Sequence, residues 1–446
     1  MKAKVPFPYL QQHPNRRLQS AWNYAQIGLL ILPLWTLPGI VLLCFACLKT
    51  WRQQYQFIIH RPLNWGLVGF SFWLVITTVF ARYQQEALIG LSNFLPYFLI
   101  FAGYSALIQT AAQLRRLAWI LVITSVPVVI IGLGQLFWGW VGHIQLLWIV
   151  LDWIIAPTGN PPGRMASVFM YANTLSGYLV VAFSLGLGLW IENLPMSAKS
   201  DRGYAWLRCG FLSVVVIGNL VALILTDSRN AWAIAAVTGL AFAIYQGWRL
   251  IVAGVAIAVG SVLGAAFGPL PLQHGLRAVI PAFFWARLTD QLYPNRSVPS
   301  LRKTQWEFAW ALTGQHPWLG WGLRNFTPLY KAQMHEWLGH PHNFLFMLTA
   351  EIGIPGAIFF CGWVSWIIVQ GLQSLHNWQE DNSFSSRQLV TDKLIFFSYL
   401  VAFFACVLCN TVDVTVFDAR LNSIGWLLLS AICGVAYYRQ EARINV

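Results

Sequence analysis

The sequence predicts an all-α, polytopic integral membrane protein with about 12 transmembrane helices and a large helical extracytoplasmic loop. Of its 446 residues 57% are hydrophobic and only 10% are charged, whereas about a quarter of the residues of a soluble domain carry charge. A series of apolar runs is also long enough to cross about 30 Å of hydrocarbon. An ordinary soluble enzyme is therefore excluded.

Ten apolar runs have about the length of a membrane span. They are residues 63–80, 89–108, 117–138, 168–190, 209–226, 231–245, 250–268, 343–370, 394–410 and 421–438. The stretch 22–48 is too long for one straight span and contains Pro33 and Pro38. Because basic residues flank it on both sides, the positive-inside rule predicts a hairpin of two short helices with both ends in the cytoplasm.

The predicted membrane topology divides the chain into five parts. They are a cytoplasmic N-terminal segment 1–21, transmembrane helices 1–9 in 22–268, a large periplasmic loop 269–342, transmembrane helices 10–12 in 343–438 and a cytoplasmic tail 439–446. The N-terminal segment lacks the short apolar core and cleavage site of a signal peptide, so we expect the first span to be retained. The expected location is the bacterial inner membrane, with both termini cytoplasmic.

The net charge of +13 is divided unequally between the two sides of the membrane in this predicted topology. The cytoplasmic side holds 17 basic and 6 acidic residues, whereas the outer side holds 11 basic and 9 acidic residues, and nine of those 11 are Arg. The charge is thus an orientation signal, and no nucleic-acid partner is expected. The seven Cys lie in or beside apolar runs, which favours small buried hydrophobic residues over redox or metal roles.

Two polar patches lie beside predicted outer membrane boundaries, where charged side chains indicate function. Arg164 opens one span, with Asn173 in its first turns, and Thr226–Asn230 forms a short outer turn that contains Asp227 and Arg229. The alternative for this turn is an interfacial ion pair with snorkelling side chains.

Two further patches belong to the outer loop and its exit. Arg302 precedes a helix-like stretch around 306–312, and Arg324 follows the run Pro-Trp-Leu-Gly-Trp-Gly. Either arginine could instead be a solvated loop charge. The last patch, His340–Leu345, opens the long span that contains Glu351.

The histidines at 335, 340 and 342 raise the alternative of a metal site. The pair His335 and His340 misses the i, i+4 spacing that places two ligands on one helix face. The sequence also has no Asp-x-Asp pair and no P-loop. We therefore expect no metal and no cofactor.

The outer face thus combines several arginines with one well-placed histidine. A guanidinium binds phosphate oxygens through two parallel hydrogen bonds and stays charged. Histidine is the usual general base near pH 7. Together these residues indicate glycosyl transfer from a lipid-linked diphosphate donor.

The motifs resemble the O-antigen ligase and O-antigen polymerase superfamily of bacterial membrane glycosyltransferases over roughly residues 160–420. The resemblance runs in family order through Arg164–Asn173 with Tyr178, Thr226–Arg229, Arg302 with Trp306, Pro317–Gly322 with Asn325 and Phe326, His342 with Asn343, Glu351–Gly353, and an outer turn with Asp413 and Asp418. It implies a twelve-helix enzyme whose outer loop caps a lateral cavity.

The resemblance also implies a reaction and a site. The reaction is an inverting, metal-independent transfer of a glycan from an undecaprenyl-diphosphate-linked donor to the lipid A core or another saccharide. His342 would be the catalytic base, and Arg164, Arg229 and Arg302 would bind the diphosphate. Additional candidates are Arg324, Asn173 and Glu351.

Three alternatives remain open at this point. A polymerase would extend the glycan on its own carrier, and it needs the same donor site. The superfamily also contains relatives labelled inorganic-carbon transporters, which would use the arginines as an anion site; His342 favours an enzyme. A non-catalytic envelope scaffold would need neither the arginines nor the histidine.

Overall fold

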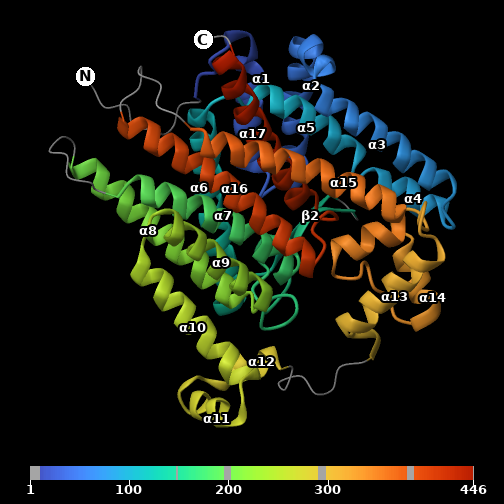
Figure 1. Cartoon of the computed structure of the whole chain (residues 1–446), viewed down its shortest axis with the longest axis vertical. Coiled ribbons are helices and arrows are strands. Elements are labelled where there is room, and N and C mark those ends of the chain that lie inside the picture. The colour runs from blue at the N-terminus through green and yellow to red at the C-terminus, as the bar shows by residue number, and fades with distance from the viewer. Residues whose placement is uncertain (1–10, 147–148, 195–201, 290–297, 379–385, 445–446) are drawn as a thin grey trace.

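The computed structural model describes residues 11–146, 149–194, 202–289, 298–378 and 386–444. Helices dominate this part of the chain, as Figure 1 shows. The α-helices are α1 Gln19–Ile31, α2 Thr36–His60, α3 Pro62–Val79, α4 Gln84–Leu91, α5 Leu95–Leu107, α6 Ala111–Phe137, α7 Ala172–Glu192, α8 Arg202–Leu225, α9 Arg229–Tyr245, α10 Arg249–Phe267, α11 Leu270–Val279, α12 Ala282–Leu288, α13 Arg302–Gln315, α14 Phe326–Met334, α15 Phe344–His376, α16 Ser386–Val412 and α17 Ala419–Ile444.

A β-hairpin corrects the all-α prediction in one place. Strands β1 (Gly142–Leu146) and β2 (Ile149–Ile155) pair antiparallel in the segment between α6 and α7. The second strand is rich in β-branched residues, which favour a strand. Its run is too short for its apolar pattern to separate a strand from a buried helix.

The predicted spans coincide with helices. One or two helices cover each of the eleven predicted segments, the ten apolar runs and the stretch 22–48, and nine helical stretches of the described residues are long and apolar enough to cross a membrane. Helices α1, α2 and α9 are outside those nine. A multi-pass membrane protein is supported, while the count of twelve spans stays a prediction.

The first hairpin forms as two helices, α1 and α2, which pack closely on each other. The break between them contains Pro33, and a Cβ on Gly39 would lie 2.5 Å from the Leu32 Cα. Glycine therefore permits the close approach of the two helices. Helix α2 continues to His60, well beyond the predicted end at residue 48.

Helices α7 and α17 form the centre of the bundle. Helix α7 packs against α6, α8, α9 and α16, and α17 packs against α5, α15 and α16. In each of the two, 83% of the most apolar window is buried, against 11% in α10. Helix α10 therefore exposes its apolar surface, as expected of a helix that faces lipid.

The segment 269–342 forms two separate helical groups (Figure 1). Helices α11 and α12 lie at the end of α10, whereas α13 and α14 pack on α15. Helix α13 confirms the helix predicted around 306–312. All seven cysteines are free thiols that are buried or half-buried, which agrees with their predicted packing role.

Helix α15 breaks at Gly353, where φ is 76° and ψ is 167°. Pro355 follows and has no N–H to donate. Four hydrogen bonds satisfy the backbone groups that the break releases: Trp321 N–H to Ala350 O (2.9 Å), Gly322 N–H to Glu351 O (2.8 Å), Trp73 Nε1–H to Ile352 O (3.0 Å) and Ile354 N–H to Pro317 O (2.8 Å). The Pro-Trp-Leu-Gly-Trp-Gly run is thus an anchor that joins the outer segment to the broken helix.

Replacing Gly353 with alanine is expected to destabilise the protein by about 1–3 kcal/mol or more, because only glycine tolerates this backbone conformation. A Cβ at this position would also lie 2.0 Å from the Trp318 carbonyl oxygen. Thermal unfolding in detergent measures the effect. Gly362→Ala is the matched control, since its Cβ would meet nothing within 4 Å and alanine favours a helix interior; equal melting temperatures for both variants would contradict the anchor.

Candidate functional site

The first two polar patches lie against each other. Arg164 donates from Nε to the Thr226 carbonyl at 2.8 Å and from Nη2 to Asn173 Oδ1 at 2.7 Å. The backbone N–H of Met165 donates to the Leu225 carbonyl at 2.9 Å. Asn173 therefore positions Arg164 on the turn between α8 and α9.

The third patch joins the same turn through Arg302, the first residue of α13. With the amide oxygen of Asn230 turned towards Arg302, both terminal guanidinium nitrogens donate to it at 3.2 Å. Arg229 precedes Asn230 as the first residue of α9. The segment Thr226–Asn230, which contains Arg229, thus contacts both Arg164 and Arg302, and these come from parts of the chain that lie far apart in the sequence.

The fourth patch contains a histidine pair that shares one carboxylate. His342 Nδ1 lies 3.0 Å from Asp413 Oδ1, and His340 Nε2 lies 3.5 Å from the same oxygen. The His342 backbone N–H donates to His340 Nδ1 at 3.2 Å. This bond assigns the proton of a neutral His340 to Nε2, on the side of Asp413.

The environment fixes the charges of this cluster. Burial lowers the pKa of His340 to about 4, against the opposing effect of Asp413, and the charges of His342 and Arg302 lower it further. Burial alone would raise the pKa of Asp413, but the hydrogen bond from His342 and the charges of both histidines lower it to about 2. At neutral pH the cluster therefore holds a carboxylate beside an uncharged His340.

The rings of Trp306 and Phe346 pack at 5.9 Å, so the first turns of α13 lie against the first turn of α15, which follows the histidine pair. It follows that the outer turn, the start of α13 and the His340–Asn343 segment face one region. Both Asp227 (φ 53°) and His342 (φ 49°) adopt left-handed backbone conformations there. Such conformations in residues other than glycine cost energy and cluster at functional sites.

Arg324 and Glu351 contact other parts of the chain near the outer segment. Arg324 Nε lies 3.1 Å from Glu86 Oε2. The buried carboxyl group of Glu351 accepts the backbone N–H of Phe326 at 3.4 Å and also that of Arg324. The Arg324 guanidinium also lies 5.8 Å from the centre of the Phe417 ring, which stacks on His340, so Arg324 stays a candidate beside the histidine pair.

Three candidate functional residues were not among the site residues predicted from the sequence. Asp413 appeared only as part of a resembling turn, and His340 only as a metal alternative. Arg420 was missed: it is buried, donates to the Val168 carbonyl at 2.7 Å and pairs with Asp418 at 3.2 Å. The signal that could have found it is a charge at the start of a predicted span, the same signal that singled out Arg164.

An apolar pocket of about 340 Å³ opens between α15, α16 and α17. Aromatic and aliphatic side chains such as Phe344, Phe360 and Trp426 line most of it. Asn410, Thr411 and Thr415 form a polar part of the lining within three residues of Asp413. An apolar chain bound in the pocket would therefore end beside the histidine pair.

The same cluster has a donor set for a cation. One ligand atom each from His340, His342 and Asp413 lie within 4.8 Å of one another. Two imidazoles and a carboxylate are common zinc ligands. The hydrogen bonds given above account for the arrangement without an ion, so a chelator is the direct test.

Residues 212–361 match the family model described as O-antigen ligase. Over these residues, about a third of the chain, the protein is similar to the O-antigen ligase family. The resemblance found in the sequence is thereby confirmed, and the matched region contains Arg229, Arg302 and His342. No curated protein gives a significant match to the chain.

The O-antigen ligase region does not contain the whole site. Arg164 precedes the matched residues, and Asp413 follows them. Both contact residues inside or next to the region: Arg164 bonds to Thr226, and Asp413 bonds to His342. The site is thus assembled from the O-antigen ligase region and the helices on either side of it.

Proposed function

We propose that the chain is an O-antigen ligase-type glycosyltransferase of the bacterial inner membrane. It transfers a glycan from an undecaprenyl-diphosphate-linked donor to a hydroxyl of the lipid A core or another saccharide on the periplasmic side. The observation that carries the proposal is the His342–Asp413 pair, which lies beside a basic outer turn and an apolar pocket.

His342 is the general base of this reaction. With Asp413 ionised, Nδ1 of His342 donates to the carboxylate at 3.0 Å, which leaves the lone pair of Nε2 free to take a proton. The side chain is 27% exposed, so an acceptor hydroxyl can approach it. The deprotonated oxygen attacks the anomeric carbon on the face opposite the diphosphate, and the configuration inverts.

Arg164, Arg229 and Arg302 hold the diphosphate. The leaving group departs with the electron pair of the glycosidic bond, and its negative charge grows in the transition state. Fixed guanidinium groups stabilise that charge without a metal ion. Because Thr226 and Asn173 orient Arg164 before the substrate arrives, little reorganisation is needed.

The pocket between α15, α16 and α17 takes part of an isoprenoid chain. Its lining is mainly apolar, and it ends at polar residues next to Asp413. Burial of apolar chain contributes about 0.8 kcal/mol per CH₂ group. The carrier lipid thus supplies binding free energy while its diphosphate lies at the membrane surface.

The proposal is tested with the purified protein in liposomes, a lipid-linked glycan donor and a saccharide acceptor. A glycan joined to the acceptor, in the presence of a chelator, supports a metal-independent ligase. Growth of the glycan on its own carrier assigns a polymerase instead. Uptake of labelled bicarbonate without glycan transfer contradicts the enzyme.

Removal of one diphosphate ligand gives a second test. Arg302→Gln is expected to lower kcat/KM for the donor by about 10- to 100-fold, since hydrogen bonds to charged groups contribute about 1.5–3 kcal/mol. Lys303→Gln is the matched control, because the side chain of Lys303 is 86% exposed and pairs only loosely with Glu307. Equal losses in both variants would indicate a general effect of charge rather than a defined ligand.

A further inference from the structure

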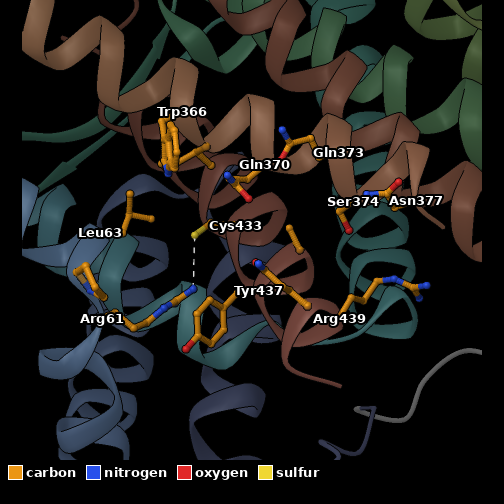
Figure 2. A pocket seen from close by; sticks show the side chains of 14 residues that line it. Arg61, Leu63, Trp366, Gln370, Gln373, Ser374, Asn377, Cys433, Tyr437 and Arg439 are labelled. Carbon is orange, nitrogen blue, oxygen red and sulfur yellow. Dashed lines mark hydrogen bonds between the residues drawn. The ribbon is translucent and has the colours of Figure 1, made fainter. Parts of the chain in front are cut away.

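A second pocket lies at the other end of the helices that carry the histidine site. Its volume is about 400 Å³, and it lies between the start of α3 and the final turns of α15 and α17 (Figure 2). Helix α3 runs between this pocket and the outer segment. Pro62, at its start, lines the pocket. Just beyond its other end, the backbone N–H of Arg82 donates to the carbonyl of Trp321 in the outer segment. Eighteen residues of helix span roughly 27 Å.

Arg61 lies on one wall of this pocket and is only 3% exposed. Its Nη1 donates to the Ser105 hydroxyl at 2.9 Å, and its guanidinium lies 4.0 Å from the centre of the Tyr437 ring. Among the described residues no carboxylate oxygen lies within 4.0 Å of the Arg61 nitrogens. The side chain is therefore a buried cation without an anionic partner.

A buried charge is costly unless it is paired. The Ser105 hydroxyl and carbonyl, the Cys433 sulfur and the Tyr437 ring face offset part of that cost. They do not neutralise the charge. An anion bound in the pocket would neutralise the charge of Arg61. The planar guanidinium group can donate two parallel hydrogen bonds to the oxygens of a phosphate group.

The opposite wall supplies neutral hydrogen-bonding groups. Gln370, Gln373, Ser374 and Asn377 line the pocket from the end of α15. Their spacing of i, i+3, i+4 and i+7 places them on one face of the helix. Figure 2 shows this row across the pocket from Arg61.

The remaining charges also favour an anion. Arg439 lines the pocket and stacks on Trp378 at 3.6 Å. None of the 14 lining residues, all within the described chain, is acidic. The nearby carboxylate of Glu441 interacts with Tyr437 from outside the lining.

We propose that this pocket binds a phosphate group, supplied by the headgroup of an anionic phospholipid. Trp366 also lines the pocket and is 59% exposed, as is common for aromatic residues at the level of lipid headgroups. A basic pocket between membrane helices is a recognised way to hold an anionic headgroup. The site is separate from the arginines near His342 and does not depend on glycan transfer.

The test compares retention of phosphatidylglycerol after extraction from nanodiscs, counted by native mass spectrometry. The wild-type protein is expected to keep this lipid in preference to phosphatidylcholine, and Arg61→Gln is expected to weaken retention about tenfold or more. Ser374→Leu fills the pocket while keeping the buried arginine, so it tests the site if Arg61→Gln fails to fold. Arg52→Gln, an exposed arginine of α2, is the control.

A second measurement separates the two sources of phosphate. Inorganic phosphate is added to protein in phosphatidylcholine nanodiscs, and the melting temperature is recorded. Stabilisation that disappears in Arg61→Gln, without lipid retention, supports the phosphate site with a soluble ligand. Equal lipid retention in all variants, with no effect of phosphate, overturns the proposal.

Discussion

Replacing His342 with asparagine is expected to lower the rate of glycan transfer by about 10²- to 10⁴-fold, the range that a general base contributes. Asparagine removes the proton acceptor but tolerates the left-handed backbone that the structure has at this residue (φ 49°). Steady-state transfer in liposomes gives the rate. The donor KM should change little, because the arginines that hold the diphosphate stay in place.

The control is His335→Asn, in the same outer segment. His335 is exposed and also has a positive φ of 57°, so the two substitutions place the same demands on the backbone. Transfer by His335→Asn should stay near the wild-type rate. A His342→Asn enzyme that is folded and equally fast would remove His342 from the proton transfer.

The positions of the helices were predictable because the signals for them are local. A run of about 20 apolar residues is sufficient to identify a span. Basic residues on both sides of 22–48 were sufficient to identify a hairpin, and α1 and α2 form it. The hairpin β1–β2 was missed because its short apolar runs fit a strand or a helix equally well.

The composition of the site depends on contacts between distant residues, and sequence spacing does not reveal these. Arg324 and Arg302 have the same chemistry, yet Arg324 pairs with Glu86, 238 residues away. Glu351 was singled out as a carboxylate within a span, but the structure uses it to accept backbone N–H groups near the start of α14. The rule that such charges are functional does not distinguish catalysis from anchoring.

Arg61 is a residue whose proposed binding role the sequence did not indicate. In the sequence it counts as one of several basic residues that orient the first hairpin. In the structure it is 3% exposed and lines a pocket. Burial, which decides whether a charge needs a partner, is a property of the packed helices and not of the local sequence.

Asp413→Asn is expected to reduce kcat by about 10²- to 10⁴-fold with little change in the donor KM, the effect of losing the carboxylate that sets the tautomer of a catalytic histidine. The carboxylate of Asp413 only accepts hydrogen bonds, so Nδ1 of His342 must carry the proton and Nε2 is free. An asparagine amide can instead donate to Nδ1. The proton then moves to Nε2, and the base is blocked.

Asp418→Asn separates this effect from a loss of structure. Asp418 accepts the backbone N–H groups of Arg420 and Leu421 at 3.0 Å, a capping role that asparagine also fills. The variant keeps these caps but weakens the ion pair with the buried Arg420 (3.2 Å), so it measures what a weakened outer turn alone costs, and we expect it to fold with only a modest loss of transfer. If Asp413→Asn and Asp418→Asn lose the same small fraction of kcat, Asp413 only supports the turn, and the basicity of His342 must come from elsewhere. If only Asp413→Asn fails at an unchanged melting temperature, the carboxylate acts through the histidine.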